Sequence, residues 1–317
     1  MRRLNVAVLG CGSWGVNHAR VYKGLRSADL VYVVDINTEV AKTTAELYGA
    51  ASSSEPEDIF RSDDVDAVSI CTPTVTHYDL ATRALKAGKH VLVEKPMAYD
   101  VAEAERLVNT ATEAGRSLSV GFVERFNPAV VEAKRLVAGG EVGELLTLST
   151  KRVSRRPLRR GDVGVVKDLA IHDVDVASYI IGRQPASVYA CVGSISHGFE
   201  DYAYINLLYR GGRVALLEVN WLTPRKVRSL VLTGSEGIIN VEYITQQLSI
   251  EKDARVVQPI NGFTEPLIVE LSDFVGSILE GGQPQVTGVD GLNALKVCEA
   301  ALESAHSQSV VYLGAWT

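Results

Sequence analysis

Residues 167–175, KDLAIHDVD, bring acidic side chains and a histidine into a segment whose other residues are mostly apolar. In an α-helix, at about 100° per residue, Asp168, His172, Asp175 and Tyr179 fall on one face. Burying such groups is costly unless they pair with one another or meet a polar ligand. The pattern therefore predicts either a structural Asp–His network or an acid–base site in which His172 exchanges a proton with a hydroxyl group.

Lys95 is a second residue that can do chemistry, because it ends the apolar run HVLVEK before a proline. Ligands bind at the carboxyl ends of strands in open α/β sheets. An ammonium group at that position can stabilise a developing alkoxide. The alternative, an ordinary surface lysine, fits poorly at the end of so apolar a strand.

The segment GCGSWG follows the apolar run LNVAVL and has the spacing G-x-G-x-x-G. Such glycines allow a tight turn, a close approach of backbone to a pyrophosphate, and close packing of helix on strand. We assign this segment to the cofactor, with Asp35 twenty residues beyond it as the ligand of the ribose hydroxyls. No Arg or Lys follows within DINTEV, so the motif predicts NAD rather than NADP. The predicted cofactor residues of the segment are Gly10, Cys11, Gly12, Ser13, Trp14 and Gly15.

A polar turn, Cys71, Thr72 and Pro73, ends another predicted strand and is also assigned to the cofactor. His77 begins the helix that follows. Two interpretations of His77 remain open, contact with the cofactor and a helix-end histidine that bonds backbone.

Composition limits the class of protein. The 317 residues favour two domains, which we place at 1–121 and 122–317. A net charge of −6 argues against a protein built to hold nucleic acid or an anionic membrane. Four scattered cysteines without a CxxC pair indicate a reducing cytoplasm, and no metal site is expected. The initial apolar run stops after six residues, so it is interpreted as a strand and not as a secretion signal.

The elements that must position these residues follow from the hydrophobic pattern. Up to about residue 120, β-branched runs alternate with helical segments, which predicts an N-terminal doubly wound parallel sheet of the Rossmann type. After a helix around 127–138, runs of period two at 202–210 and 213–221, joined by a Gly-Gly turn, predict a large open, mostly antiparallel sheet. Helices near 266–281 and 290–306 and a strand SVVYL complete this α/β domain.

The chain resembles the Gfo/Idh/MocA family of oxidoreductases over nearly its whole length. The resemblance rests on GCGSWG, AGKHVLVEKPMA at 87–98, VERFNPAV at 123–130 and DLAIHDVD at 168–175. It implies oxidation of a sugar or cyclitol hydroxyl with a nicotinamide cofactor, His172 or Lys95 accepting the proton and Asp168 orienting or charging His172. It also implies that Glu94, Lys95 and Glu124 contact the cofactor. The residues that it implies for the substrate are Lys95, Arg125, Asn127, Asp168 and His172.

The segment 151–166 carries five arginines in a net acidic protein. Guanidinium groups suit phosphate oxygens, so this loop is expected to hold the diphosphate of a nucleotide sugar. The alternative is a solvated loop or an oligomer contact. The run looks most like the family's nucleotide-sugar branch, with UDP-N-acetylglucosamine oxidised at its 3-hydroxyl; a free cyclitol or sugar is the second choice, and a dinucleotide-binding regulator without turnover is the third. The arginines are Arg152, Arg155, Arg156, Arg159 and Arg160.

The two period-two runs place apolar side chains on both faces of the predicted sheet. Tyr204, Leu208, Leu216 and Trp221 cannot all face the helices, because side chains alternate across a strand. An exposed apolar sheet face is a common protein interface. We therefore expect a homodimer or a homotetramer.

Overall fold

The computed structural model describes residues 2–156, 161–195, 198–253, 255–257 and 262–314. By their internal contacts, residues 1–122 and 267–292 form one compact unit, and residues 123–266 and 293–317 form another. The sequence predicted a single boundary after residue 121. The additional segment 267–292 lies far along the chain, and no local sequence pattern connects it to the first unit.

The first unit is built on a parallel sheet of six strands in the order β3-β2-β1-β4-β5-β6. The order reverses between β1 and β4, which is the position where doubly wound sheets bind their ligands. The five apolar runs predicted as strands form β1, β2, β4, β5 and β6. No run predicted the short β3. The strands are β1 (Leu4–Leu9), β2 (Ala28–Val34), β3 (Ala51–Ser53), β4 (Ala67–Ile70), β5 (His90–Val93) and β6 (Leu118–Val120).

Helices connect these strands, and polar residues set several of their ends. The side chain of Asn37 accepts the N–H groups of residues 39 and 40, and that of Asp100 accepts the N–H of residue 103. Such caps satisfy the first amides of a helix. The helical elements are α1 (Ser13–Gly24), α2 (Thr38–Tyr48), α3 (Pro56–Phe60), the 3-10 turn η1 (Thr74–Thr76), α4 (His77–Lys86), α5 (Val101–Ala114) and α8 (Pro266–Glu280).

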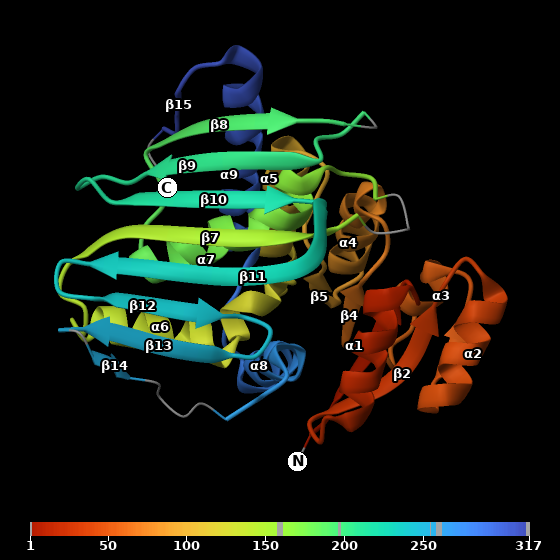
Figure 1. Cartoon of the computed structure of the whole chain (residues 1–317). Helices are drawn as coiled ribbons and strands as arrows, with labels where there is room; N and C mark the ends of the chain where they lie inside the picture. The colour runs from red at the N-terminus through yellow and green to blue at the C-terminus, as the bar shows by residue number, and fades with distance from the viewer. Residues whose placement is uncertain (1, 157–160, 196–197, 254, 258–261, 315–317) are drawn as a thin grey trace. The chain divides into compact units, whose positions relative to one another are not determined.

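The second unit is built on nine strands in the order β14-β13-β12-β11-β7-β10-β9-β8-β15. Only β7 and β10 pair in parallel, so the sheet is mostly antiparallel, as predicted. In Figure 1 this sheet lies in front of α6 and α7. Its strands are β7 (Leu145–Arg155), β8 (Ser187–Gly193), β9 (Tyr202–Leu208), β10 (Val214–Asn220), β11 (Leu222–Gly234), β12 (Ile238–Glu242), β13 (Gln247–Lys252), β14 (Arg255–Val257) and β15 (Val311–Tyr312).

The predicted Gly-Gly turn joins β9 to β10, and Gly211 and Gly212 both have positive φ, +92° and +83°. Only glycine adopts such a pair of conformations at low cost. The helical elements are η2 (Val123–Phe126), α6 (Pro128–Ala138), the π-helical turn η3 (Val166–Ala170), α7 (Ile171–Ile181) and α9 (Gly288–Ser307). The last of these begins among the residues of the first unit and continues into the second.

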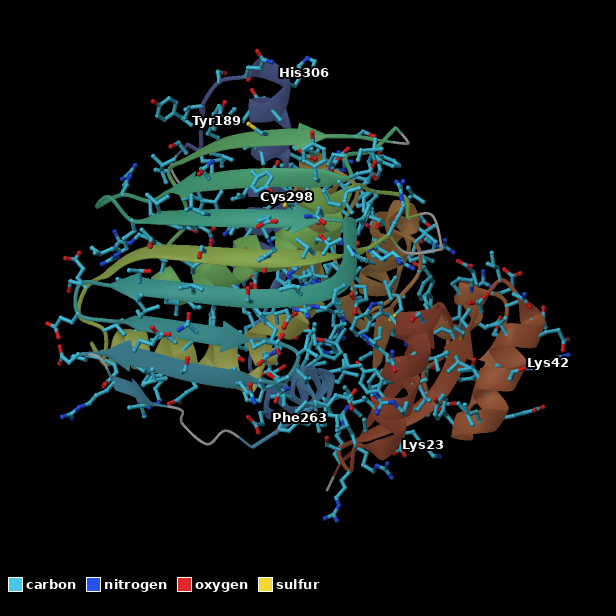
Figure 2. The ribbon with its side chains drawn as sticks, viewed as in Figure 1. Lys23, Lys42, Tyr189, Phe263, Cys298 and His306 are labelled. Atoms are coloured by element: carbon cyan, nitrogen blue, oxygen red, sulfur yellow. The ribbon has the colours of Figure 1, made fainter. Side chains whose placement is uncertain are left out.

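Alternation along β9 and β10 separates the two sheet faces as expected. Tyr204, Leu208 and Leu216 are 53%, 41% and 44% exposed, whereas the residues on either side of each of them are buried. Figure 2 looks onto this outer face, and the labelled Tyr189 of β8 projects from the same side. Trp221, which follows β10, is buried instead. Several large apolar side chains are thus left at the surface of this sheet.

Candidate active site

The glycine loop after β1 has the close packing for which its sequence was singled out. Gly10 has a φ of +89°, and a Cβ on it would lie 2.8 Å from the carbonyl group of Cys71. A Cβ on Gly15 would collide with the carbonyl oxygen of Gly10. No side chain caps the start of α1, whose N-cap residue is Gly12. The first amides of a helix attract anions, so this end of α1 suits a pyrophosphate.

Asp35 lies at the end of β2, next to the glycine loop. Its Oδ2 accepts the backbone N–H of Cys11 at 2.8 Å, and its Oδ1 accepts that of Asn37 at 2.9 Å. The sequence predicted this carboxylate as the ligand of ribose hydroxyls, and the structure places it beside the loop expected to hold the pyrophosphate. Trp14 of the loop is 44% exposed. The uncapped start of α1 and the Asp35 carboxylate thus meet at one end of the sheet, as a dinucleotide site requires.

His77 has the structural role that was one of its two interpretations. Its Nδ1 lies 2.8 Å from the carbonyl oxygen of Pro96, and its Nε2 lies 2.8 Å from that of Thr72. The side chain is buried at the start of α4. The ring thus connects the loops that follow β4 and β5, and its contact with the cofactor stays a prediction.

Glu94 fixes the backbone of Lys95 and also contacts a histidine that sequence reasoning missed. Its Oε2 accepts the backbone N–H of Lys95 at 3.2 Å, and its Oε1 lies 3.1 Å from Nε2 of the buried His18. A Cβ on Gly121 would come within 2.9 Å of this carboxylate, so a larger residue would displace it. Lys95 itself is half-buried, and its peptide bond to Pro96 is cis. Nothing in the segment around His18 marks it as a partner of a residue 76 positions away.

The segment around Asp168 and His172 is not one regular α-helix. Residues 166–170 form a π-helical turn, η3, and α7 begins only at Ile171. The predicted 100° spacing therefore fails between Asp168 and His172, because a π turn is wider than an α turn. Single π turns are frequent at functional sites. Asp168 is half-buried, His172 is buried, and in α7 only Tyr179 is not buried.

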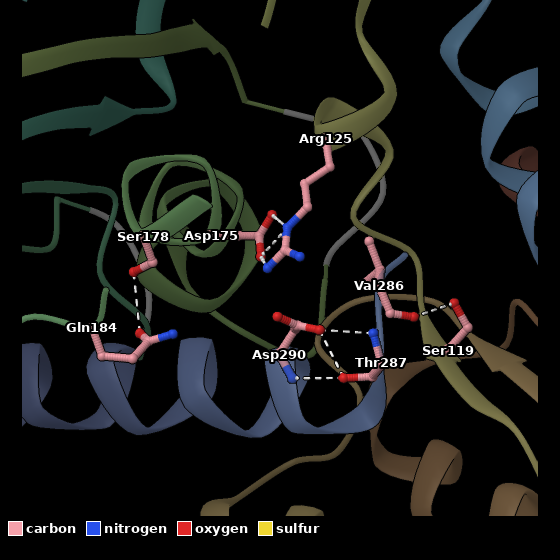
Figure 3. Close-up of polar contacts among 8 residues, drawn as sticks. All are labelled: Ser119, Arg125, Asp175, Ser178, Gln184, Val286, Thr287 and Asp290. Carbon is pink, nitrogen blue, oxygen red and sulfur yellow. Dashed lines mark hydrogen bonds and ion pairs between the residues drawn. The ribbon is translucent and has the colours of Figure 1, made fainter. Parts of the chain in front are cut away.

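Asp175 and Tyr179, farther along the predicted stripe, are engaged by Arg125. Arg125 Nε lies 2.9 and 2.8 Å from the two Asp175 oxygens, and Nη2 lies 2.5 Å from Oδ1 (Figure 3). The guanidinium carbon is also 5.2 Å from the centre of the Tyr179 ring. Arg125 is 6% exposed. It joins η2 to α7 through a buried ion pair, and its expected contact with substrate stays a prediction.

Arg152 is likewise used inside the second unit. Its Nη2 lies 2.9 Å from Asp173 and its Nη1 lies 2.8 Å from Glu124, and its side chain is 3% exposed. Burial alone disfavours the charge, but these two carboxylates raise the pKa of Arg152 above its ordinary value. Arg152 and Glu124 thus belong to a buried charge network, and their contacts with substrate and cofactor stay predictions. Loss of one partner from such a network leaves a buried charge without its counter-charge and is strongly destabilising.

Asn127, also predicted to contact substrate, has a structural role in the fold. Its side-chain oxygen accepts the N–H of Ala129 and so caps α6. Its Nδ2 donates to the carbonyl oxygen of Tyr243 at 3.0 Å and lies 3.3 Å from Glu124 Oε2. With 2% exposure, all of its polar atoms are used within the fold.

In the described part of the chain, arginines of the arginine-rich run form internal ion pairs. Arg156 Nη2 lies 2.8 Å from Asp201, which is 1% exposed, and its guanidinium lies 5.7 Å from the Trp221 ring centre. Arg155 is exposed at the end of β7. Arg159 and Arg160 lie outside the described residues. Arg152 and Arg156 are thus paired with acidic residues of the second unit, and the diphosphate site stays a prediction.

Within the described ranges, no group of three or more His, Cys, Asp or Glu residues is placed to hold a metal ion. In the same ranges no helix is both long and apolar enough to cross a membrane. The four cysteines are free thiols.

The fold and the glycine loop define a dinucleotide-dependent α/β oxidoreductase with a separate unit built on an open sheet. The family model described as "Oxidoreductase family, NAD-binding Rossmann fold" matches residues 4–122, and the "GFO/IDH/MocA C-terminal domain" matches residues 130–240. The chain belongs to the Gfo/Idh/MocA family of NAD-dependent oxidoreductases, which act on CH–OH groups.

Similar proteins agree with this assignment over nearly full length. An inositol 2-dehydrogenase of Rhizobium meliloti is 30% identical over 318 residues, which cover 94% of this chain and 95% of that protein. A UDP-N-acetylglucosamine 3-dehydrogenase of Acidithiobacillus ferrooxidans is 30% identical over 314 residues, 96% of each chain. The structure of an aldose-aldose oxidoreductase from Caulobacter crescentus, complexed with glycerol, has a TM-score of 0.92 and 27% identity, and covers 98% of this chain and 100% of that one.

The chain is thus an NAD-dependent dehydrogenase of sugars or polyols.

Proposed function

We propose that the protein oxidises a ring hydroxyl of a cyclitol or sugar, with an inositol as the first substrate to test. The observation that carries the proposal is the placement of Asp168 in a π turn directly before the buried His172, in a helix whose next two acidic residues are held by arginines. Inositol dehydrogenases recur among the relatives, which supports a polyol ring over the nucleotide sugar that the sequence favoured.

The proposed chemistry assigns one task to each side chain. His172 accepts the hydroxyl proton, Asp168 orients or charges the imidazole, and Lys95 stabilises the developing alkoxide. NAD, when bound, supplies the acceptor for the hydride. Glu94 and His18 are proposed to hold the backbone of Lys95 in position.

A substrate panel tests this proposal. The protein is mixed with NAD and with myo-inositol, scyllo-inositol, glucose or UDP-N-acetylglucosamine, and the absorbance of reduced nicotinamide is followed. Turnover of an inositol supports the first choice, and turnover of the UDP-sugar alone restores the nucleotide-sugar interpretation. Tight NAD binding without turnover of any polyol or sugar contradicts the proposed function.

The outer face of the nine-stranded sheet supports a second proposal, that the protein forms a homodimer or homotetramer through this face. Tyr189, Tyr204, Leu208 and Leu216 are all at least 37% exposed there. Apolar patches of this kind are rare on monomers. Light scattering at micromolar concentration measures the mass that decides the proposal.

A further inference from the structure

Arg228 lies on the inner face of the nine-stranded sheet and has no role in the site described above. Arg228 of β11 is the register partner of Arg152 of β7. Opposite residues of an antiparallel pair point to the same face, so Arg228 faces the side on which Arg152 contacts Asp173 of α7. Leu230 and Leu232 continue that face and are fully buried. Arg228 thus lies where the apolar inner face of the sheet ends.

The guanidinium of Arg228 is half-buried, and no described residue accepts a hydrogen bond from its Nη1. Its Nη1 is buried without a hydrogen-bond partner, and among the described residues Arg228 makes no ion pair. The neighbouring carboxylates of Asp173 and Glu124 are bonded to Arg152 instead. Buried polar groups almost always have a partner, so an arginine in this situation indicates that another molecule supplies the acceptor.

The geometry of a guanidinium favours an anion over a neutral acceptor. Burial, followed by the charge of Arg152, lowers the pKa of Arg228, and the charges of nearby carboxylates oppose this shift. Lys226, two residues earlier, is more exposed, and burial together with the charge of Arg228 lowers its pKa as well. A hydroxyl group offers Arg228 a single acceptor oxygen. A carboxylate or phosphate offers two or more, which match the two-pronged geometry of a guanidinium.

The position relative to the catalytic candidates connects this group with the substrate. Arg152, the register partner of Arg228, lies 2.9 Å from Asp173, which directly follows His172 in α7. We propose that Arg228, with Lys226 at its rim, binds an anionic substituent, a carboxylate or a phosphate, on the polyol ring that the enzyme oxidises. This inference rests on the proposed function, and it makes an acidic sugar derivative a better substrate than its neutral counterpart.

Matched substrates test the inference on the NAD-loaded enzyme. Glucuronate and glucose differ by a carboxylate, glucose 6-phosphate adds a phosphate, and UDP-N-acetylglucosamine carries a diphosphate. We expect kcat/KM to be at least about tenfold higher for one of the anionic compounds than for glucose or myo-inositol. Which anionic compound is preferred distinguishes a carboxylate from a phosphate.

Variants of Arg228 identify the side chain that is responsible. Arg228→Gln should raise KM for the preferred anionic compound about tenfold or more, with kcat nearly unchanged, because a remote substituent contributes equally to the ground and transition states. Arg228→Lys should restore part of the loss. The control is Arg210→Gln, an exposed arginine in the turn that precedes β10, at the other end of the strands. Equal kcat/KM for acidic and neutral compounds, or equal effects of Arg228→Gln on both, overturns the inference.

Calorimetry separates this inference from the proposed function. Glucuronate, glucose 6-phosphate and UDP-N-acetylglucosamine are titrated into the complex with reduced cofactor. Binding that is lost in Arg228→Gln, without turnover of any compound, supports the anion site and contradicts the proposed function. Turnover of a neutral polyol, with no binding of any anionic probe, supports the function and overturns the anion site.

Discussion

Asp35 and Cys11 are joined by a hydrogen bond from the backbone N–H of Cys11 to Asp35 Oδ2 at 2.8 Å. The residue expected to select the cofactor therefore also holds the glycine loop. Its second oxygen accepts the N–H of Asn37, so the carboxylate connects the turn after β1 with the start of α2. Cofactor choice and loop geometry are thus coupled through one side chain.

The first prediction separates the effect of Asp35 on cofactor choice from its effect on the glycine loop. Wild-type protein should bind NAD more tightly than NADP, because the Asp35 carboxylate repels a 2′-phosphate. Asp35→Asn should narrow the ratio of the two dissociation constants by about tenfold, equivalent to about 1.4 kcal/mol, while keeping an oxygen that can accept from the loop. Asp35→Ala should weaken binding of both cofactors in addition. Fluorescence titration measures the constants.

The exposed Asp63→Asn is the matched control for Asp35→Asn and should leave both constants unchanged. Equal affinities of the wild-type protein for NAD and NADP would contradict the prediction.

The second prediction concerns the chemical step. Lys95→Ala and His172→Ala should each lower kcat by about a hundredfold or more, the scale of electrostatic and acid–base groups. Their dissociation constants for NAD should change far less. Steady-state kinetics with the substrate found in the panel measures kcat, and Lys23→Ala and His306→Ala, both at exposed positions labelled in Figure 2, serve as controls. Near-normal turnover in either variant would remove the role proposed for that residue.

The third prediction is a pH dependence of stability that arises at His90. Its Nδ1 accepts the N–H of Ser117 at 3.1 Å, which requires the unprotonated nitrogen. Burial, followed by the charge of Arg116, lowers the pKa of His90 below its ordinary value of 6.5. Below pH 6.5 the unfolded chain binds a proton that the folded chain still excludes, so stability is present above this pH and is lost as the pH falls toward the folded pKa.

Thermal unfolding between pH 5 and pH 8 checks the contribution of His90. His90→Gln keeps a side-chain oxygen that can accept from Ser117 and should show a smaller decrease in Tm below pH 6.5 than the wild type. His306→Gln, at an exposed position in α9, should retain the wild-type pH profile. Parallel profiles for wild type and His90→Gln would show that His90 is not the group responsible.

The fourth prediction concerns the buried pair of Arg125 and Asp175. Asp175→Asn should lower the free energy of unfolding by about 3–5 kcal/mol, because it leaves the guanidinium buried without its counter-charge. The double variant Arg125→Met with Asp175→Leu should recover much of this loss, since it buries no charge. Urea unfolding followed by circular dichroism measures both. A loss below about 1 kcal/mol in Asp175→Asn would show that water reaches the pair.

Much of the fold could be predicted from sequence because its signals are local. Steric limits require glycine at positions 10 and 15 and in the turn at 211–212, and the neighbouring sequence indicates each of these positions. The hydrophobic periods of β9 and β10 likewise predicted the two faces of their sheet. Pairings over long sequence distances have no such local signal. The contact of His18 with Glu94 joins residues 76 positions apart, and nothing near either residue predicts it.

The candidate site was less predictable because an arginine can either pair with a carboxylate inside the fold or bind a ligand. The arginines at 125, 152 and 156 were expected to face ligands, but each meets an acidic residue from another element. Arg228, which lacks such a partner in the described chain, was not singled out. The signal available was the basic run PRKVR at 224–228 within a strand, where three charges would each need an acceptor. Which arginine is left without an internal carboxylate depends on the tertiary contacts.

The last prediction uses Cys191 to report whether the outer sheet face is covered. Cys191 is exposed on β8 opposite Tyr204 of β9, among the apolar side chains proposed as an interface. Cys11, Cys71 and Cys298 are less accessible, and burial raises the pKa of each of their thiols, to about 11 for Cys11. Because the thiolate is the reactive form, native alkylation should modify Cys191 almost exclusively.

An oligomer built through this face should slow that reaction at micromolar concentration. Tyr204→Glu places a charge at the proposed interface, so it should yield a monomer by light scattering and speed alkylation of Cys191 by about tenfold or more. Mass spectrometry of iodoacetamide-treated protein identifies the modified cysteine, and Cys191→Ser, which should remain nearly unmodified, is the control. A monomeric wild-type mass together with equal alkylation rates in wild type and Tyr204→Glu would show that this sheet face is open to solvent.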